Sequence, residues 1–171
     1  MAVLSRDEIL KAIEKGDIKI TPYDPNAVGC ASIDLSLSNE FRVFPKDSKT
    51  IKVTESTNYQ DHTTKVVLAP GETFMLEPGS TCLGITEERV ELSPRYCGLL
   101  EGRSRFARMG LFVHISAGFM NPGIKNRQVL EIFNTTNNRL ELTPGTKICQ
   151  FVFLELKGES SYSGRFQENS L

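Results

Sequence analysis

The chain has 171 residues, and its 20 Lys and Arg residues nearly balance its 21 Asp and Glu residues, which gives a formal net charge of −1. A chain of this length can form one domain with a proper hydrophobic core. The balanced charge argues against general binding to nucleic acid or to a membrane surface, because both require a basic excess. We therefore expect any bound anion to be held by a local cluster of cations.

The sequence also lacks the signals of export and of a membrane span. No apolar stretch approaches the roughly 20 residues of a spanning helix, and residues 1–15 carry charges throughout, unlike a secretory signal. No disulfide framework or zinc-ligand spacing is expected, because no CxxC pair occurs among the distant cysteines Cys30, Cys82, Cys97 and Cys149. These features indicate a cytoplasmic protein, and no repeat or low-complexity segment divides residues 1–171 into more than one domain.

The first expected element is a helix over residues 6–15. Ser5 and Glu8 have the spacing of a capping box, in which the serine hydroxyl and the glutamate side chain each bond the other residue's backbone. Ile9 begins an apolar stripe at helical spacing. Gly16 then offers a left-handed stop.

After this helix the hydrophobic period changes to that of β-structure. Short runs rich in β-branched residues recur, and turns rich in Gly and Pro separate them. The expected strands cover residues 18–20, 32–37, 40–44, 65–69, 73–77, 81–90, 110–116, 128–134, 140–143 and 147–156. No βαβ alternation occurs, so the pattern predicts an all-β sandwich or barrel rather than a doubly wound nucleotide-binding fold.

Two segments fall outside this pattern. Residues 45–64 are polar and read as a surface excursion or a loose hairpin. Residues 157–171 form a tail rich in Ser and Gly, which would be mobile alone. The tail also holds Tyr162, Arg165 and Phe166, so it is either a frayed terminus or a segment that orders over a ligand.

An arginine cluster is the first candidate binding feature. Residues 103–109 predict a short helical turn that stops at a glycine. On such a turn Ser104 and Arg108 lie at i,i+4, and Arg105 and Arg108 lie at i,i+3, so these side chains can converge. A hydroxyl, free backbone amides and guanidinium groups would suit a phosphate. The alternative is an ordinary solvated basic turn.

Glu131 is the second candidate. It shares one face of the expected strand with Val129 and Phe133. A carboxylate in so apolar a strand is costly to bury unless it is paired or protonated, and a buried carboxylate suits a group that holds and delivers a proton. The alternatives are a glutamate that faces solvent and an ion pair with a nearby arginine.

Three other polar residues carry weaker signals. Asn121 begins an Asn-Pro-Gly turn, which is typical of a hairpin corner. His114 stands alone in an apolar strand, a pattern more typical of a packed core residue than of a ligand. His62 lies in the polar excursion and indicates nothing further.

Together these residues resemble dCTP deaminases of the trimeric dUTPase superfamily. The resemblance rests on EGRSRFARMGLFVHISAGFMNPG, VLEIFN and PGTKICQ, and covers essentially the whole chain. LSRDEILKAIEKGDIKITPYDP and ASIDLSLSNEFRVF are similar to the family's opening, and YSGRFQ is similar to its Tyr…Lys-Tyr-Gln ending. The resemblance implies a distorted β-barrel (dUTPase-like, β-clip) with an N-terminal helix and a short internal helix. It also implies a homotrimer whose active sites lie where subunits meet, and a tail over residues 157–171 that closes over the site.

The same resemblance assigns roles to individual residues. It places catalysis on Glu131, Ser104, Arg108 and the backbone carbonyl of Ala117. It places substrate binding on Arg103, Ser104, Arg105, Arg108, Asn121, Val129, Leu130, Glu131, Gln150, Tyr162 and Arg165. The implied substrate is dCTP, with no nucleic acid or membrane partner, and Mg²⁺ is expected to accompany the triphosphate.

The chemistry of deamination limits how such a site can work. Attack at cytosine C4 needs an activated water and a protonated ring N3. Zinc deaminases obtain hydroxide from a metal bound by an H-x-E…P-C-x-x-C signature, which this sequence lacks. We therefore expect a zinc-independent reaction in which Glu131 shuttles protons. Ser104 and the Ala117 carbonyl would orient the water, and Arg108 would set the environment of Glu131.

Departures from the family pattern shape the expected activity. Asn121 stands where family members usually have Asp, and an amide cannot act as a base. Arg105 replaces the family's second serine, and the tail differs at several positions. We expect a deaminase that makes dUTP and ammonia in pyrimidine deoxynucleotide synthesis. The alternatives are a bifunctional deaminase–diphosphatase or a dUTPase that yields dUMP and pyrophosphate, and a nucleotide-binding regulatory trimer without turnover.

Overall fold

The protein is described by a computed structural model that covers residues 2–47, 49–164 and 171. Its two α-helices within these residues are α1 (Arg6–Glu14) and α2 (Ser104–Ala107), and two 3-10 turns are η1 (Pro25–Ala27) and η2 (Tyr59–His62). The strands are β1 (Ala2–Val3), β2 (Ile18–Thr21), β3 (Ile33–Val43), β4 (Thr64–Val67), β5 (Phe74–Leu76), β6 (Thr81–Leu92), β7 (Tyr96–Gly102), β8 (Leu111–Val113), β9 (Phe119–Met120), β10 (Lys125–Asn134), β11 (Leu140–Leu142) and β12 (Lys147–Glu155).

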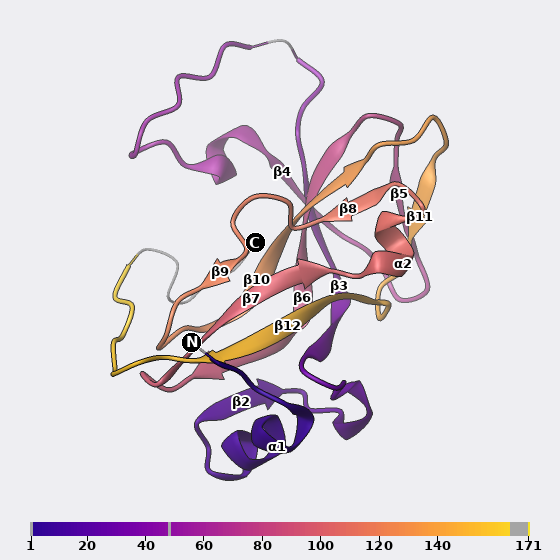
Figure 1. Cartoon of the computed structure of the whole chain (residues 1–171). Helices are drawn as coiled ribbons and strands as arrows, with labels where there is room; N and C mark the ends of the chain where they lie inside the picture. Colours follow the sequence, from indigo (N-terminus) through magenta and orange to yellow (C-terminus); the bar gives the residue numbers. More distant parts are fainter. Residues whose placement is uncertain (1, 48, 165–170) are drawn as a thin grey trace.

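One large antiparallel sheet dominates the structure (Figure 1). Its strand order is β8-β10-β6-β3-β12-β7-β9, with β1, β2 and β4 paired to β12, β6 and β3. β5 and β11 form a separate two-stranded sheet. The large sheet curls into a half-barrel, so the prediction of an all-β, distorted-barrel fold with an N-terminal helix and a short internal helix is confirmed.

Aromatic side chains and long apolar strands build the core. Phe41 and Phe74 stack with ring centroids 4.4 Å apart, and the rings of Phe151 and Phe153 lie 4.8 Å apart. β3, β6 and β12 supply most of the fully buried residues, because their inward positions are nearly all apolar. The core therefore lies inside the curl of the large sheet.

The start of α1 differs from the expected capping box. Ser5 occupies the N-cap position, but its side chain makes no capping hydrogen bond. Glu8 instead bonds Lys11 at 2.7 Å on the exposed face of the helix, so the capping box was wrong. Gly16 does end this segment in a left-handed conformation, with φ of 77°.

Several strands differ from the expected runs. Residues 32–37 and 40–44 are one strand, β3, rather than two. Residues 110–116 form a strand only over β8, because His114 adopts a positive φ that breaks the extended backbone. The sequence did not indicate β7, whose apolar pattern Gly98 interrupts. A side chain at Gly98 would collide with the ring of Phe151.

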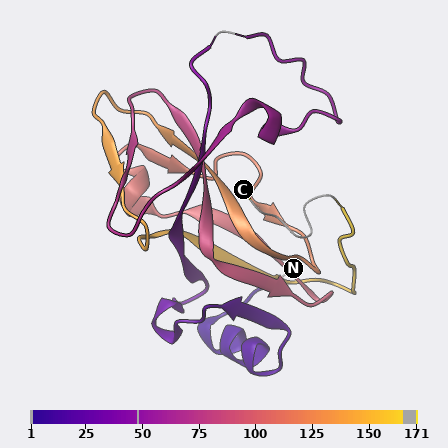
Figure 2. The same ribbon diagram turned by 180° about the vertical axis from the view of Figure 1, so that it is seen from behind.

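The expected surface excursion and the cysteines agree with the structure. The segment that carries η2 projects from the sheet, while α1 and β2 lie at the other end of the molecule (Figures 1 and 2). All four cysteines are free, and only Cys30 is exposed. Among the described residues, no helix has the length and apolar character that a bilayer crossing requires.

Candidate active site

The main cavity lies against the outward face of β10. Its volume is about 450 Å³. Besides β10, the loop after β8, the strand β9 with the turn that follows it, the excursion and the tail contribute to its wall. The lining residues are Phe44, Tyr59, Leu83, His114, Ala117, Phe119, Met120, Asn121, Ile124, Asn126, Arg127, Gln128, Val129, Glu131 and Tyr162. Five of the expected site residues are thus brought together, namely Ala117, Asn121, Val129, Glu131 and Tyr162.

Burial alternates along β10, although the buried Asn126 and Gln128 also line the cavity near a register shift between Arg127 and Val129. Every second residue from Asn126 to Asn134 is buried, and Arg127, Val129 and Glu131 lie between them on the half-exposed face. Leu130 is fully buried in the core, so only its backbone is available to a ligand. The expected two faces of this strand are therefore present.

The two oxygens of the Glu131 carboxylate have different surroundings: Oε2 faces His114, and Oε1 is available to a ligand. Oε2 is shielded from solvent and lies 3.0 Å from Nδ1 of His114, while the side chain as a whole remains 36% exposed. Oε1 has no hydrogen bond to any described residue. The sequence left open an ion pair with an arginine or a free, solvent-facing carboxylate. The structure instead pairs Glu131 with a histidine.

His114 lines the cavity beside Glu131, which the sequence did not indicate. Its side chain is 4% exposed, as expected for a packed residue, yet both ring nitrogens contact polar groups of the cavity wall. Nε2 lies 3.1 Å from the carbonyl oxygen of Ala117, and the backbone N–H donates to the carbonyl of Glu131 at 2.7 Å. Burial lowers the pKa of His114, but Glu131 and the Ala117 carbonyl outweigh it, so this pKa lies above its usual value.

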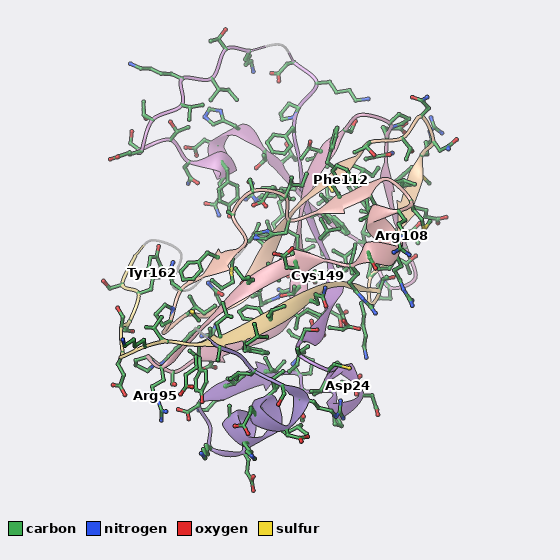
Figure 3. The ribbon with its side chains drawn as sticks, viewed as in Figure 1. Asp24, Arg95, Arg108, Phe112, Cys149 and Tyr162 are labelled. Atoms are coloured by element: carbon green, nitrogen blue, oxygen red, sulfur yellow. The ribbon has the colours of Figure 1, made fainter. Side chains whose placement is uncertain are left out.

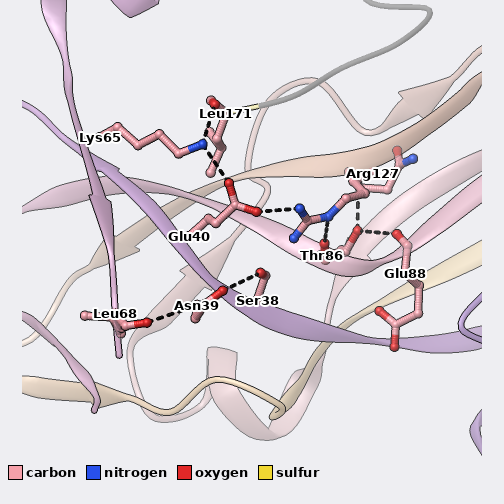
Figure 4. Close-up of polar contacts among 10 residues, drawn as sticks. Ser38, Asn39, Glu40, Lys65, Leu68, Thr86, Glu88, Arg127 and Leu171 are labelled. Carbon is pink, nitrogen blue, oxygen red and sulfur yellow. Dashed lines mark hydrogen bonds and ion pairs between the residues drawn. The ribbon is translucent and has the colours of Figure 1, made fainter. Parts of the chain in front are cut away.

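Arg127 is a second lining residue that the sequence did not indicate. Its Nε donates to the carbonyl of Thr86 at 2.6 Å and its Nη1 pairs with Glu40 at 2.5 Å (Figure 4). Lys65 bonds the other oxygen of Glu40 at 2.7 Å. Lys65, and then Arg127, lower the pKa of the Glu40 carboxyl against the effect of its partial burial. The network fixes this cation at the edge of the cavity.

The described part of the tail docks beside Asn121. The backbone N–H of Tyr162 donates to the carbonyl of Pro122 at 2.9 Å, and that of Ser160 donates to Pro94 at 3.0 Å. Ser161 packs so closely against Gly123 that a side chain there would collide with the Ser161 hydroxyl. The φ of 78° at Gly123 also favours glycine. Tyr162 is thereby held at the cavity, whereas Arg165 lies outside the described residues.

The arginine cluster occupies α2, at a different place. Arg103 is the N-cap, and Gly110 ends the segment with φ of 80°. The side chains of Ser104, Arg105 and Arg108 are exposed, and none of them bonds a described residue. Three polar side chains, two of them cationic, are therefore presented to solvent from one helical turn.

Arg103 and Gln150 are instead engaged within the chain. Nη2 of Arg103 lies 2.9 Å from Oδ2 of Asp34, and its Nη1 donates to the carbonyl of Lys147 at 2.7 Å. Gln150 accepts a hydrogen bond from Ser32 at 3.0 Å. Binding of a ligand by either side chain would therefore compete with these contacts.

One chain thus carries two separate groups of expected site residues. None of Arg103, Ser104, Arg105, Arg108 or Gln150 lines the cavity that holds Glu131. Figure 3 shows Arg108 and Tyr162 on opposite sides of the molecule. No cluster of three or more His, Cys, Asp or Glu residues within the described part of the chain could hold a metal ion, and zinc independence stays a prediction.

Solved structures show which fold this arrangement belongs to. The 2'-deoxycytidine 5'-triphosphate deaminase of Agrobacterium tumefaciens aligns with a TM-score of 0.67 and 20% identity, over 88% of this chain and 47% of that one. The present chain therefore spans about half the length of that protein. A dUTPase of Staphylococcus bacteriophage 80alpha aligns with a TM-score of 0.50 and 15% identity, over 86% of this chain and 96% of that one. The fold is dUTPase-like.

Sequence comparison then identifies the family. A family model described as dCTP deaminase-like matches residues 3–156. A "dCTP deaminase, dUMP-forming" of Methanopyrus kandleri is 37% identical, over 91% of this chain and 83% of that protein. A "dCTP deaminase" of Halorubrum lacusprofundi is 36% identical, over 91% of this chain and 78% of that protein. The chain belongs to the dCTP deaminase-like family.

Proposed function

We propose that this protein is an enzyme that hydrolyses the C4 amine of dCTP. The observation that carries the proposal is the wall of the cavity where His114 contacts both the Glu131 carboxylate and the Ala117 carbonyl. These two acceptors are what an attacking water needs, and the free Oε1 of Glu131 faces the space where a base can lie. The names of the family relatives point to the same reaction.

The proton steps can be assigned to Glu131. The water oxygen bonds to C4 while one of its protons passes through Glu131 to ring N3. The hydroxyl proton of the tetrahedral intermediate then passes through the same carboxylate to the amine. The C4–N bond breaks, its electron pair leaves on nitrogen, and ammonia departs as the C4 carbonyl forms. Positioned proton transfer of this kind contributes about 10²–10⁴-fold to a rate.

We propose further that the complete site forms between copies of the chain in a homotrimer. The separation of α2 from the cavity supports this, because Ser104 and Arg108 have no contact with Glu131 within one chain. Exposed apolar side chains on β8, on the loop after it and on β9 also leave surface for a second copy to cover: Phe112, Ile115 and Phe119 are 42%, 57% and 51% exposed. Ser104 and Arg108 of a neighbouring copy would then complete the water site.

The triphosphate would lie between the cations of α2 and the tail. Arg105 is exposed and unpaired with described residues, so it can meet phosphate oxygens directly. Mg²⁺ would be held by phosphate oxygens and water, and it would neutralise phosphate charge. An enzyme of dCTP turnover would act in the cytoplasm, in the synthesis of pyrimidine deoxynucleotides.

We propose dUTP, rather than dUMP, as the product. Asn121 lines the cavity where the family's aspartate would activate a second water, and its amide cannot accept a proton. The second candidate function is that of a deaminase that continues from dUTP to dUMP and pyrophosphate. Relatives from Methanopyrus kandleri and Corynebacterium efficiens are named "dCTP deaminase, dUMP-forming", which favours this candidate.

The product is tested by following ammonia and pyrophosphate separately, with dCTP and with dUTP as substrates. We expect ammonia from dCTP and no pyrophosphate from either nucleotide. Asn121→Asp should gain pyrophosphate release from dUTP, on the order of 10²-fold for a newly placed base. Asn137→Asp, at an exposed position of a remote turn, is the matched control. Pyrophosphate from dUTP with the unaltered chain would establish the second candidate, and tight dCTP binding without ammonia would indicate a non-catalytic binding protein.

A further inference from the structure

We infer that His114 is a positioning residue that shares one proton with Glu131 and fixes the two acceptors of the attacking water. The catalytic consequence rests on the proposed function. The pairing itself rests only on the geometry and can be measured without substrate.

The proton inventory follows from the two contacts of the imidazole ring. A backbone carbonyl can only accept a hydrogen bond, so Nε2, 3.1 Å from the Ala117 oxygen, must carry a proton. Nδ1 and Oε2 of Glu131 lie 3.0 Å apart. A bare nitrogen and a bare carboxylate at this distance would repel, so the pair must hold one proton, although the two atoms are not aligned as in a standard hydrogen bond. Either the imidazole is cationic beside a carboxylate, or it is neutral beside a carboxylic acid.

Burial keeps this proton with the pair. Both Nδ1 and Oε2 are shielded from solvent and lie 3.0 Å apart as a pair, and neither makes a hydrogen bond of standard geometry with any described residue. A polar group that is buried without a partner costs free energy of folding, because it has lost its hydrogen bonds to water. The pair can therefore move the proton internally, while Oε1 of Glu131 faces the cavity and exchanges protons with a ligand.

The backbone at His114 supports a dedicated position. Its φ is 57°, and no other non-glycine residue in the described part of the chain has a positive φ. The strand β8 ends at Val113, directly before this conformation. This left-handed region is uncommon for non-glycine residues, and His, like Asn and Asp, adopts it more often than the others do. The backbone N–H of His114 also donates to the Glu131 carbonyl at 2.7 Å. Backbone and side chain thus both connect the loop after β8 to β10, which sets the Ala117 carbonyl relative to the Glu131 carboxylate.

The charged groups that act on His114 come from two strands. Glu131 on β10 raises its pKa, and Glu101 on β7 adds a smaller effect in the same direction. Burial alone lowers the pKa of an imidazole, and burial is the largest single influence on this one. Removal of the Glu131 charge should therefore reverse the sign of the shift.

The pairing can be measured by following the Cε1–H signals of the histidines by NMR against pH. The chain has two histidines, and His62 in η2, which is not part of the cavity wall, serves as the internal reference. We expect His114 to titrate above its ordinary value of 6.5, and to titrate below it in Glu131→Gln. The signal of His62 should be the same in both proteins, and the dispersed methyl signals of the buried core report that the variant is folded. A midpoint for His114 below 6.5 in the unaltered chain, or one that Glu131→Gln leaves unchanged, would overturn the inference.

His114→Asn separates positioning from folding, because asparagine tolerates the left-handed backbone but cannot reach both acceptors. We expect kcat for dCTP to fall about 10²-fold, as for a misplaced reacting group, with little change in KM and a shifted pH profile of kcat. A fall in kcat with an unchanged pH profile would mean that His114 acts only structurally. If dCTP is not a substrate at all while the NMR coupling is present, the proposed function fails and the pairing stands.

Discussion

Glu131→Gln should lose deamination of dCTP while it still binds the nucleotide. Glutamine keeps the length of the side chain and its hydrogen-bonding groups, but it cannot take a proton from water or return one to the leaving amine. A positioned acid–base group contributes about 10²–10⁴-fold, so we expect ammonia release to fall by at least this range. Ammonia production and equilibrium binding of dCTP, measured on the same sample, report the two properties separately.

Glu14→Gln is the matched control for this substitution. Glu14 is an exposed carboxylate on α1 without a partner among the described residues, and it should give unaltered turnover. Near-normal turnover in Glu131→Gln would refute the proton-shuttle role. Loss of both turnover and binding would show instead that the carboxylate holds the nucleotide.

Two inactive variants should restore activity when their chains assemble together. Glu131→Gln removes the acid–base group from the cavity, and Arg108→Ala removes a cation from α2. If each site combines the cavity of one copy with α2 of another, some sites in a mixed assembly contain neither defect. Random assortment of equal amounts gives roughly one quarter of the unaltered activity. The measurement is ammonia release from dCTP after the two chains are unfolded and refolded together.

The control pairs two variants whose defects lie in the same cavity. Glu131 and Asn121 line one cavity of one chain, so a mixture of Glu131→Gln with Asn121→Ala should show no restoration. If the first mixture also stays inactive although its chains have exchanged, the site is complete within one chain. That result would contradict a shared site.

The sequence predicted the fold class and the orientation of the key strand. The short runs rich in β-branched residues correspond to most of the strands. Gly16 and Gly110 have a left-handed backbone and end the two helical segments where expected. The two faces of β10 also followed from alternation, which placed Glu131 with Val129 on the outward face. These features depend on local spacing and local backbone preference, which a single sequence contains.

The missed features depend on contacts between distant residues. His114 meets Glu131 only because β8 pairs with β10, with Val113 opposite Ile132, and no spacing in the sequence indicates this. β7 was missed because Gly98 makes room for a ring from β12 rather than filling a place in an apolar pattern. Likewise, Tyr59 reaches the cavity from a polar excursion whose composition indicates only a surface position. Arg127 could have been found, because it lies on the same face as Glu131.

We propose that this chain deaminates dCTP with its own acid–base group and without zinc. The most direct measurement is ammonia release from dCTP by enzyme that has been stripped of metal with a chelator and then supplied with Mg²⁺ alone. We expect this enzyme to turn over dCTP at the rate of the untreated enzyme. Loss of the reaction that Mg²⁺ does not restore, and that zinc does, would contradict it.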